Sequence, residues 1–514
     1  MRVKLTIINS TFNILSQIVQ LILSFIIRNL FIKYIGIEFL GLSGLFTNIL
    51  SALNLADLGV GAAITYYLYK PLAEKDLSKV KGLMGFYKKT YYTIGTIIII
   101  VGLIILPFIQ FLIRDQSLDL PYIRILFLIQ LAGTASTYFL AYKRTLLFVD
   151  QKNYIAAIVD SSINIIMMVV RVGALIYFQS YVVYLIVILF QNILSNVIIS
   201  IICGRLYSYL KDKQQPVEQV DTKTIYKDLK NIVVEKLVSY IHYSTDNIII
   251  SKFLGLASAG LLANYTLIYN TVQTFIVQIT SAVQASFGNY VNSGYNERDI
   301  YTVFKRFTFL CYFCISFSLV SFLTLIQPFI RLWLGDKYIL SYHIIVILCI
   351  TYFISTLRIP LIQMVSIYGL FREMKYVAIL AAIVNLSISI VLIRKIGVVG
   401  TLIGTMISES IYWTGQTYYV LWKKLKVPCK EYIVIILRFI LITLGEILIT
   451  LSISHTYTGL NPIIGFIFKA LLCIIIPNLI NILFFFHTDE LKYYRNLLKI
   501  AYNKRYARIK SSRQ

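Results

Sequence analysis

The sequence predicts an all-α integral membrane protein with about 14 transmembrane helices, arranged as two parallel six-helix repeats followed by two C-terminal helices. Of its 514 residues, 58% are hydrophobic and only 14% are charged, which is too little polar surface to enclose a soluble core. Apolar runs of roughly 20 residues, the length that crosses a hydrocarbon core of about 30 Å, recur along the whole chain. The third observation is that the two halves of the chain resemble each other.

The transmembrane helices are predicted from apolar runs separated by charged or turn-rich breaks. The first begins in "MRVKLTIINSTFNILSQ", which has no small-residue cleavage site after an apolar core and is therefore read as helix rather than signal peptide. No loop between the runs is long enough for a separate soluble domain. The predicted spans are 7–35, 42–69, 91–113, 120–142, 154–178, 181–204, 231–254, 260–290, 304–329, 339–366, 374–393, 397–422, 432–453 and 461–486.

The net charge of +25 is explained by the position of the lysines and arginines. Most lie on alternate loops and at both ends of the chain, as expected when both termini are cytoplasmic, and this agrees with an even number of helices. The basic linker 205–230 and the basic tail 487–514 are thus predicted to be cytoplasmic and to lie beside anionic lipid. Nucleic acid is not an expected partner.

Three pairs of segments repeat at an offset of about 220 residues. "NLFIKYIGIEFLGLSG" at 29–44 resembles "NIIISKFLGLASAGLL" at 247–262, with two glycines in register. "LAEKDLSKV" resembles "YNERDIYTV", and "NYIAAIVDSSINIIMMVVR" resembles "KYVAILAAIVNLSISIVLIR". The predicted organisation is an N-lobe (1–204), the linker (205–230), a C-lobe (231–422), helices 13 and 14 (423–486) and the tail (487–514).

Parallel six-helix repeats are typical of transporters, in which two lobes enclose a central site and rock to expose it to either side of the membrane. Transport is therefore the function that the architecture favours, although architecture does not name the cargo.

Arg28 lies within the apolar run of helix 1, in "QLILSFIIRNLFIKYIGIEFLG". A charge at the bilayer centre costs roughly 2.5–3.5 kcal/mol on insertion scales, so it must face a partner, water or a substrate. The repeat aligns Arg28 with Asp246 of helix 7, at similar depth and with opposite charge. We expect both to face the central cavity and to contact each other when it is closed outward. The alternative is that each finds polar partners within its own lobe.

Asp160, Asn164 and Arg171 are spaced to share one face of helix 5. This polar stripe is interpreted either as a cavity wall that contacts a polar cargo or as hydrogen bonding between helices of the lobe.

Other ionisable residues within spans are candidates for coupling and binding. Asp57 and Glu409 are acids that could take up H⁺ or Na⁺ in a coupled cycle, and no other cofactor is expected. Arg358 in helix 10 offers positive charge to a phosphate. Glu446 and Lys469, on the neighbouring helices 13 and 14, are predicted to form a structural salt bridge. The scattered cysteines and the four histidines do not predict a catalytic or metal site.

The chain resembles the bacterial polysaccharide-export family. The resemblance rests on the helix count, on "YIGIEFLGLSGLFTNILSALNLADLGVGAAI" in the first half and on "STDNIIISKFLGLASAGLLANYTLIY" in the second. The family includes Wzx-type flippases for O-antigen, capsule and exopolysaccharide units, and belongs with lipid II flippases and MATE multidrug exporters. The resemblance implies MATE-like lobes that move an undecaprenyl-pyrophosphate-linked oligosaccharide across the bacterial plasma membrane by alternating access.

The resemblance also implies roles for particular residues and partners. Arg28, Arg171 and Arg358 would meet the pyrophosphate or acidic sugars, while the lipid tail stays in the bilayer. Expected partners are the lipid-linked oligosaccharide, membrane lipids, and polysaccharide polymerase and assembly proteins. The protein is not expected to be an enzyme.

Two other functions compete with the flippase. A MATE-type drug or cation antiporter would favour acidic over basic cavity groups. A membrane polysaccharide polymerase or glycosyltransferase would carry a large extramembrane catalytic loop or an acidic metal-binding motif, and neither is evident in the sequence.

Overall fold

The computed structural model describes residues 2–54, 60–114, 119–211, 245–456 and 461–511. Within these ranges the regular structure is entirely helical, which confirms the predicted all-α membrane fold. The chain divides into two compact units, Met1–Ala263 and Asn264–Gln514, and each is described by itself.

Ten helices in the described ranges are long and apolar enough to cross a membrane. The other four predicted spans are also helical where they are described. The span 42–69 contains α2 and α3 on either side of residues 55–59, and 231–254 is described only from residue 245. The spans 260–290 and 397–422 correspond to α10 and α15, which are richer in polar and small side chains.

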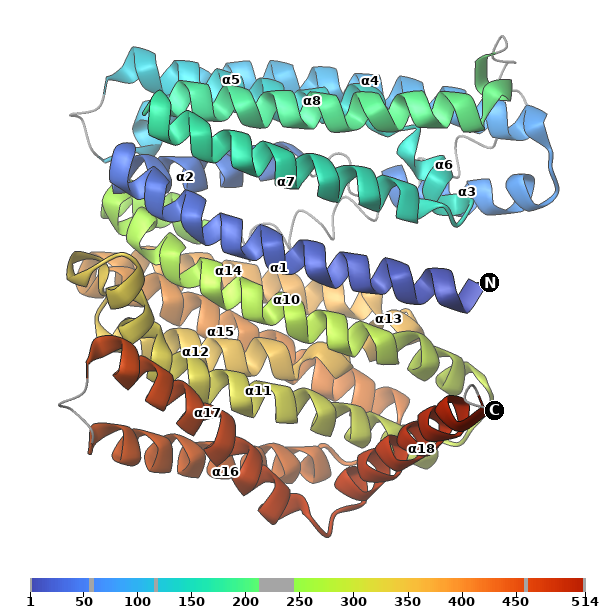
Figure 1. Ribbon diagram of the computed structural model, residues 1–514, viewed down its shortest axis with the longest axis vertical. Helices are drawn as coiled ribbons and strands as arrows, with labels where there is room; N and C mark the ends of the chain where they lie inside the picture. The colour runs from blue at the N-terminus through green and yellow to red at the C-terminus, as the bar shows by residue number, and fades with distance from the viewer. Residues whose placement is uncertain (1, 55–59, 115–118, 212–244, 457–460, 512–514) are drawn as a thin grey trace. The chain divides into compact units, whose positions relative to one another are not determined.

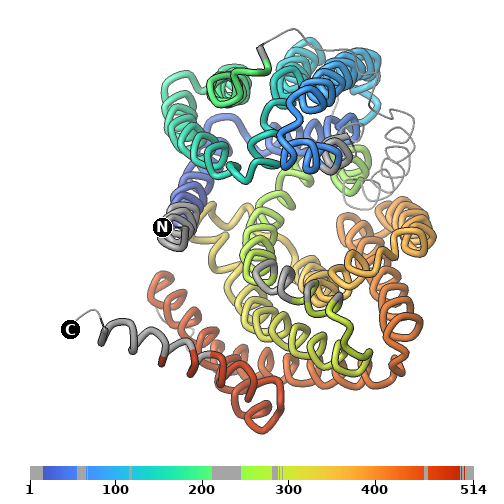
Figure 2. The backbone as a smooth tube through the Cα atoms, turned by 90° about the vertical axis from the view of Figure 1, so that its right-hand side faces the viewer, coloured from blue at the N-terminus to red at the C-terminus, as the bar shows by residue number. Residues whose placement is uncertain are grey.

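In the first unit, α5 packs against both α4 and α8, and α7 packs between α8 and α1 (Figure 1). Figure 2 shows the helices of this unit nearly end-on. A helical segment at 245–253 and the first turns of α10 complete the unit. The bounds are α1 Arg2–Tyr34, α2 Ile37–Leu53, α3 Val60–Ala73, α4 Leu77–Ile105, η2 Leu106–Leu112, α5 Leu120–Ala141, α6 Arg144–Val149, α7 Asn153–Tyr177, α8 Tyr181–Leu206, η3 Ser208–Lys211 and α10 Leu256–Asn292.

In the second unit, α14 and α15 form the most extensive helix pair, α12 packs on α15, and the C-terminal helices α16 and α17 pack on α11. The predicted span 339–366 is broken into two helices at Arg358, because a proline follows two residues later. The bounds are α11 Glu297–Trp333, η4 Asp336–Tyr338, α12 Tyr342–Leu357, α13 Ile359–Tyr368, α14 Phe371–Ile396, α15 Val398–Thr417, η5 Tyr418–Lys424, α16 Cys429–His455, α17 Pro462–Phe485 and α18 Asp489–Ser511.

The sequence repeat has a counterpart in local structure. Asp76 caps α4 by accepting a hydrogen bond from the backbone N–H of Lys79 at 3.0 Å. Asn296 caps α11 in the same way, from the N–H of Asp299 at 2.8 Å. The two caps lie in the repeated segments "LAEKDLSKV" and "YNERDIYTV", so the equivalent helix has the same kind of N-cap in both copies.

The repeated glycines also occupy equivalent conformations. Gly36 before α2 has φ 108° and Gly255 before α10 has φ 95°, a region that disfavours side chains with a Cβ.

Gly41 and Gly260, the second pair of repeated glycines, lie against each other's helices. A Cβ on Gly41 would lie 1.9 Å from the carbonyl oxygen of Leu256, and one on Gly260 would lie 2.3 Å from that of Ile37. This reciprocal backbone contact places the start of α10 in the first unit. The unit boundary after Ala263 therefore lies later than the predicted start of the C-lobe at 231, and most of the predicted linker 205–230 lies outside the described residues.

Candidate functional site

The polar stripe on α7 forms a hydrogen-bonded network with its neighbours. Arg171 Nη2 donates to Asn164 Oδ1 at 3.3 Å, two turns away on the same face. Asn164 Oδ1 also accepts from Gln191 Nε2 of α8 at 3.3 Å, and Asn164 Nδ2 donates to Gln20 Oε1 of α1 at 2.8 Å. Asn164 thus joins three helices of the first unit, which is the interhelical bonding that the second interpretation of the stripe predicts.

Asp160, one turn before Asn164, is paired with Arg144 of α6. Its carboxylate also accepts a 2.5 Å hydrogen bond from the Ser195 hydroxyl of α8. The carboxylate and guanidinium are both partly accessible. The charge of Asp160 is therefore balanced within the first unit, by an arginine that sequence reasoning did not single out.

Arg28 of α1, like Arg171 and unlike Arg358, makes no ion pair with any described residue. Its Nη1 is buried and has no hydrogen-bond partner among the residues that the structure describes. Tyr184 of α8 lies close enough to interact electrostatically with the guanidinium. Phe31, one turn further along α1, packs edge-on against Tyr181 and Tyr184 with ring centroids 5.2 Å apart in both pairs. A guanidinium with an unused donor beside aromatic rings suits an anionic, ring-bearing ligand.

The ion pair predicted between Arg28 and Asp246 is not formed in this structure, and the pairing stays a prediction. Asp246 lies on the described helical segment 245–253, where the next residue, Asn247, approaches Gly44 of α2. Asp57, the other acid proposed for ion coupling besides Glu409, lies outside the described residues.

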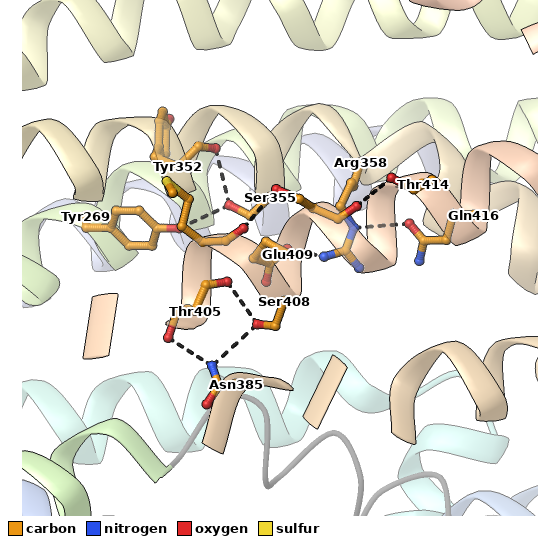
Figure 3. Close-up of polar contacts among 12 residues, drawn as sticks. Tyr269, Tyr352, Ser355, Arg358, Asn385, Thr405, Ser408, Glu409, Thr414 and Gln416 are labelled. Atoms are coloured by element: carbon orange, nitrogen blue, oxygen red, sulfur yellow. Dashed lines mark hydrogen bonds and ion pairs between the residues drawn. The ribbon is translucent and has the colours of Figure 1, made fainter. Parts of the chain in front are cut away.

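Arg358 and Glu409 form a buried ion pair in the second unit (Figure 3). Arg358 occupies the break between α12 and α13, and Glu409 lies in the middle of α15. Arg358 Nε also donates to Gln416 Oε1 at 3.1 Å, and its guanidinium lies 4.7 Å from the centre of the Tyr412 ring. The helix break thus points the arginine at three polar or aromatic partners along α15.

This pairing changes what each residue can do. Sequence reasoning assigned Arg358 to a phosphate and Glu409 to a coupling ion, as separate roles. In the structure the two side chains are only 3% and 2% exposed, so each neutralises the other. Either role requires the pair to open first.

Glu446 of α16 makes different contacts from those predicted. Its carboxylate accepts a 2.5 Å hydrogen bond from Ser316 of α11, and Asn481 of α17 donates to the same hydroxyl at 2.8 Å. In the described structure Glu446 forms no ion pair with Lys469, so the predicted salt bridge is wrong. The cluster instead ties α16 and α17 to α11 through hydrogen bonds that join the Glu446 carboxylate to two uncharged side chains.

Several residues of these networks were not predicted, since their polar partners lie far away in sequence. Arg144 lies outside the predicted spans, and the three glutamines at 20, 191 and 416 lie within spans but are uncharged. A search restricted to ionisable residues within spans misses such partners. A search that included amides on the predicted helices would have found the glutamines. It would not have identified the residues that they contact.

The chain is similar to a known protein family and to solved structures of membrane transporters. The family model described as polysaccharide biosynthesis protein matches residues 7–287. No curated protein matches the chain in sequence. A structure of the lipid II flippase MurJ in an inward closed conformation is similar with a TM-score of 0.61 and 18% identity, covering 92% of this chain and 99% of that one. An inward-facing multidrug resistance MATE family transporter of the MOP superfamily gives 0.60 and 14%, covering 80% and 99%. The shared fold is that of transporters and flippases.

Proposed function

The chain belongs to the polysaccharide biosynthesis protein family, and we propose that it is a flippase for undecaprenyl-pyrophosphate-linked oligosaccharide units. The units would be moved from the inner to the outer leaflet of a bacterial plasma membrane for assembly into capsule, exopolysaccharide or O-antigen. Two lobes would alternate their access to the two sides.

The observation that carries this proposal is the state of Arg28. Its guanidinium lies within an apolar helix, and among the described residues its buried donor has no partner and it forms no ion pair. Leaving a buried charge uncompensated is unfavourable, so the position is best explained by an anionic ligand that completes it. A pyrophosphate supplies several acceptor oxygens, and guanidinium binds such groups through paired hydrogen bonds.

Arg171 and Arg358 would contribute in different ways. Arg171 bonds a neutral amide, so its charge is available to a ligand without the loss of a counter-ion. Arg358 would be released only when Glu409 is neutralised, and this offers a route for coupling. Uptake of H⁺ or Na⁺ by Glu409 would free the guanidinium for the cargo phosphate. Asp57 is the second candidate for ion coupling.

The proposed topology has both termini in the cytoplasm, because the loops on that side carry most of the lysines and arginines. The expected partners are the lipid-linked oligosaccharide, surrounding lipids, and the polymerase and assembly proteins that use the flipped unit. Neither enzymatic activity nor nucleic acid binding is part of the proposal.

A MATE-type drug or cation antiporter is the second candidate, since the fold is also similar to that of a MATE transporter. The uncompensated arginine in α1 favours an anionic over a cationic cargo. A membrane polymerase is the less favoured third alternative.

The proposal is tested by deleting the gene in a strain that has no redundant flippase. We expect loss of surface polysaccharide and accumulation of the lipid-linked repeat unit, measured by mass spectrometry of extracted lipids. Unchanged surface polysaccharide without accumulation would contradict it.

Complementation separates the role of Arg28 from general damage. Arg28→Ala should fail to restore surface polysaccharide although the protein is present in the membrane. Arg28→Lys keeps the charge but loses the paired donors, so this variant should restore surface polysaccharide only in part. The matched control is Arg331→Ala, which removes an exposed arginine paired with Asp336 and should complement fully.

A further inference from the structure

A basic pocket of about 250 Å³ is present at one end of the first unit. It lies where α4 begins and α8 ends. Lys81 and Lys88, two turns apart on one face of α4, line it together with Lys143 between α5 and α6. Met84 and Leu210 provide apolar walls. The pocket therefore brings three ammonium groups from two parts of the chain around one small volume.

Asp150 and Asp160, the two acids that follow Lys143 most closely in the chain, are paired with other cations. Asp160 pairs with Arg144. Asp150 pairs with Lys152 at 2.7 Å and accepts a 2.7 Å hydrogen bond from the Tyr207 hydroxyl. Burial works against the ionisation of Asp150, yet these two partners hold the pKa of its carboxyl below the usual value. Neither carboxylate is thus available to balance the charge of the pocket.

Two of the three lysines have no counter-charge among the described residues. Lys88 forms no ion pair there and lies 5.8 Å from the centre of the Tyr92 ring. Lys143 forms none either, and its ammonium donates to the neutral hydroxyl of Ser200 at 2.8 Å. An ammonium has three donors, so both lysines retain hydrogen-bonding capacity for an anion.

A second hollow, of about 530 Å³, continues from the pocket along α4. Lys88 lines both volumes, and the second runs past Tyr92 and Thr96 to Ile97. Ile97 and Ile100 are large exposed apolar side chains on this part of α4. The predicted transmembrane span begins at residue 91, just beyond Lys88. The predicted span therefore places a charged pocket at the membrane surface, beside an exposed apolar strip of α4.

We propose that this basic pocket binds the phosphate-bearing headgroup of an anionic phospholipid, with an acyl chain along α4. The charge of the pocket favours phosphate over a zwitterionic headgroup, because basic pockets between transmembrane helices attract anionic lipid. The adjoining strip favours a lipid over a soluble anion, since only a lipid fills both volumes. This site is separate from the flippase cargo, so it does not depend on the proposed function.

The test measures binding of phosphatidylglycerol, phosphatidylcholine and inorganic phosphate to the purified full chain in detergent, by native mass spectrometry and by thermal stabilisation. We expect phosphatidylglycerol to bind in preference to the other two. The double variant Lys88→Gln/Lys143→Gln should weaken its binding by about fivefold per lysine. Lys88→Arg/Lys143→Arg keeps the charges and should keep the preference, which separates lost charge from misfolding.

The matched control removes two exposed lysines from the second unit, in Lys375→Gln/Lys430→Gln, and should change phosphatidylglycerol binding less than twofold. Equal binding of phosphatidylglycerol and phosphatidylcholine to the unmodified chain would overturn the proposal. Equal loss in the pocket and control variants would also overturn it, because the effect would then be one of net charge. Stabilisation by inorganic phosphate as large as that by phosphatidylglycerol would overturn the assignment to a lipid.

Discussion

The buried pair of Arg358 and Glu409 offers the sharpest test of the energetics. Glu409→Ala is expected to destabilise the second unit by about 3–5 kcal/mol, because it leaves a buried guanidinium without its counter-charge. The two side chains are 3% and 2% exposed, so water cannot replace the lost carboxylate. The hydrogen bond to Gln416 and the ring of Tyr412 remain, but neither carries a formal negative charge.

Replacing both partners should have a smaller effect than replacing one. Arg358→Met/Glu409→Leu substitutes apolar side chains of similar size, and such exchanges of buried ion pairs are often neutral or stabilising. The double variant should therefore recover most of the stability that either single variant loses. The coupling energy from the double-mutant cycle should exceed about 2 kcal/mol.

The assay is equilibrium unfolding of the purified full chain in detergent, followed by tryptophan fluorescence. Trp413 lies one turn from Glu409 on α15 and reports on this region. The control pair is Arg331 and Asp336, which are 60% and 77% exposed, and Asp336→Ala should cost less than about 1 kcal/mol. The reasoning is refuted if Glu409→Ala costs no more than this control, or if the double variant loses the sum of the two single losses.

Three further changes test the packing and the polar networks by the same unfolding measurement. Gly41→Ala places a Cβ 1.9 Å from the Leu256 carbonyl oxygen and should lower the free energy of unfolding by about 1–3 kcal/mol or more. Gly82→Ala is the control, because a Cβ there has no neighbouring atom within 4 Å, and it should stabilise α4. Equal effects of the two substitutions would contradict the close approach. Asn164→Ala removes two hydrogen bonds between helices and one within α7, and it should lower the free energy of unfolding by about 1–3 kcal/mol. An unchanged free energy of unfolding would mean that the network does not contribute to stability. Glu446→Gln should match or exceed the native stability, because it removes a buried charge that has no counter-ion among the described residues. Glu446→Ala should cost about 1–3 kcal/mol. A Gln variant less stable than the Ala variant would show that the charge itself is required.

The helices could be predicted from the sequence because long apolar runs specify spans directly. The runs at 120–142 and 154–178 agree closely with α5 and α7. The helix that contains the predicted span 91–113 begins earlier, at Leu77. Lysines in its first turns hide the helix from a search for apolar residues, although the capping Asp76 marks its start.

The faces of single helices were also predictable, whereas contacts between helices were not. The spacing of Asn164 and Arg171 placed them on one face, and the structure joins them by a hydrogen bond. In contrast, nothing in the sequence indicates that Glu409 meets Arg358, since that contact depends on how α15 packs beside the break after α12. Pairing between distant residues is set by tertiary packing, and a single sequence does not contain a direct signal for it.

The central claim is that the protein moves a pyrophosphate-linked oligosaccharide across a bilayer, and reconstitution tests it most directly. Liposomes containing the purified full chain would be loaded with an undecaprenyl-pyrophosphate oligosaccharide on the inner leaflet, and an added glycosidase would report its arrival outside. The account predicts time-dependent cleavage that exceeds the rate in protein-free liposomes and is lost in Arg28→Ala. Cleavage no faster than in protein-free liposomes, from protein that is folded and inserted, would contradict it.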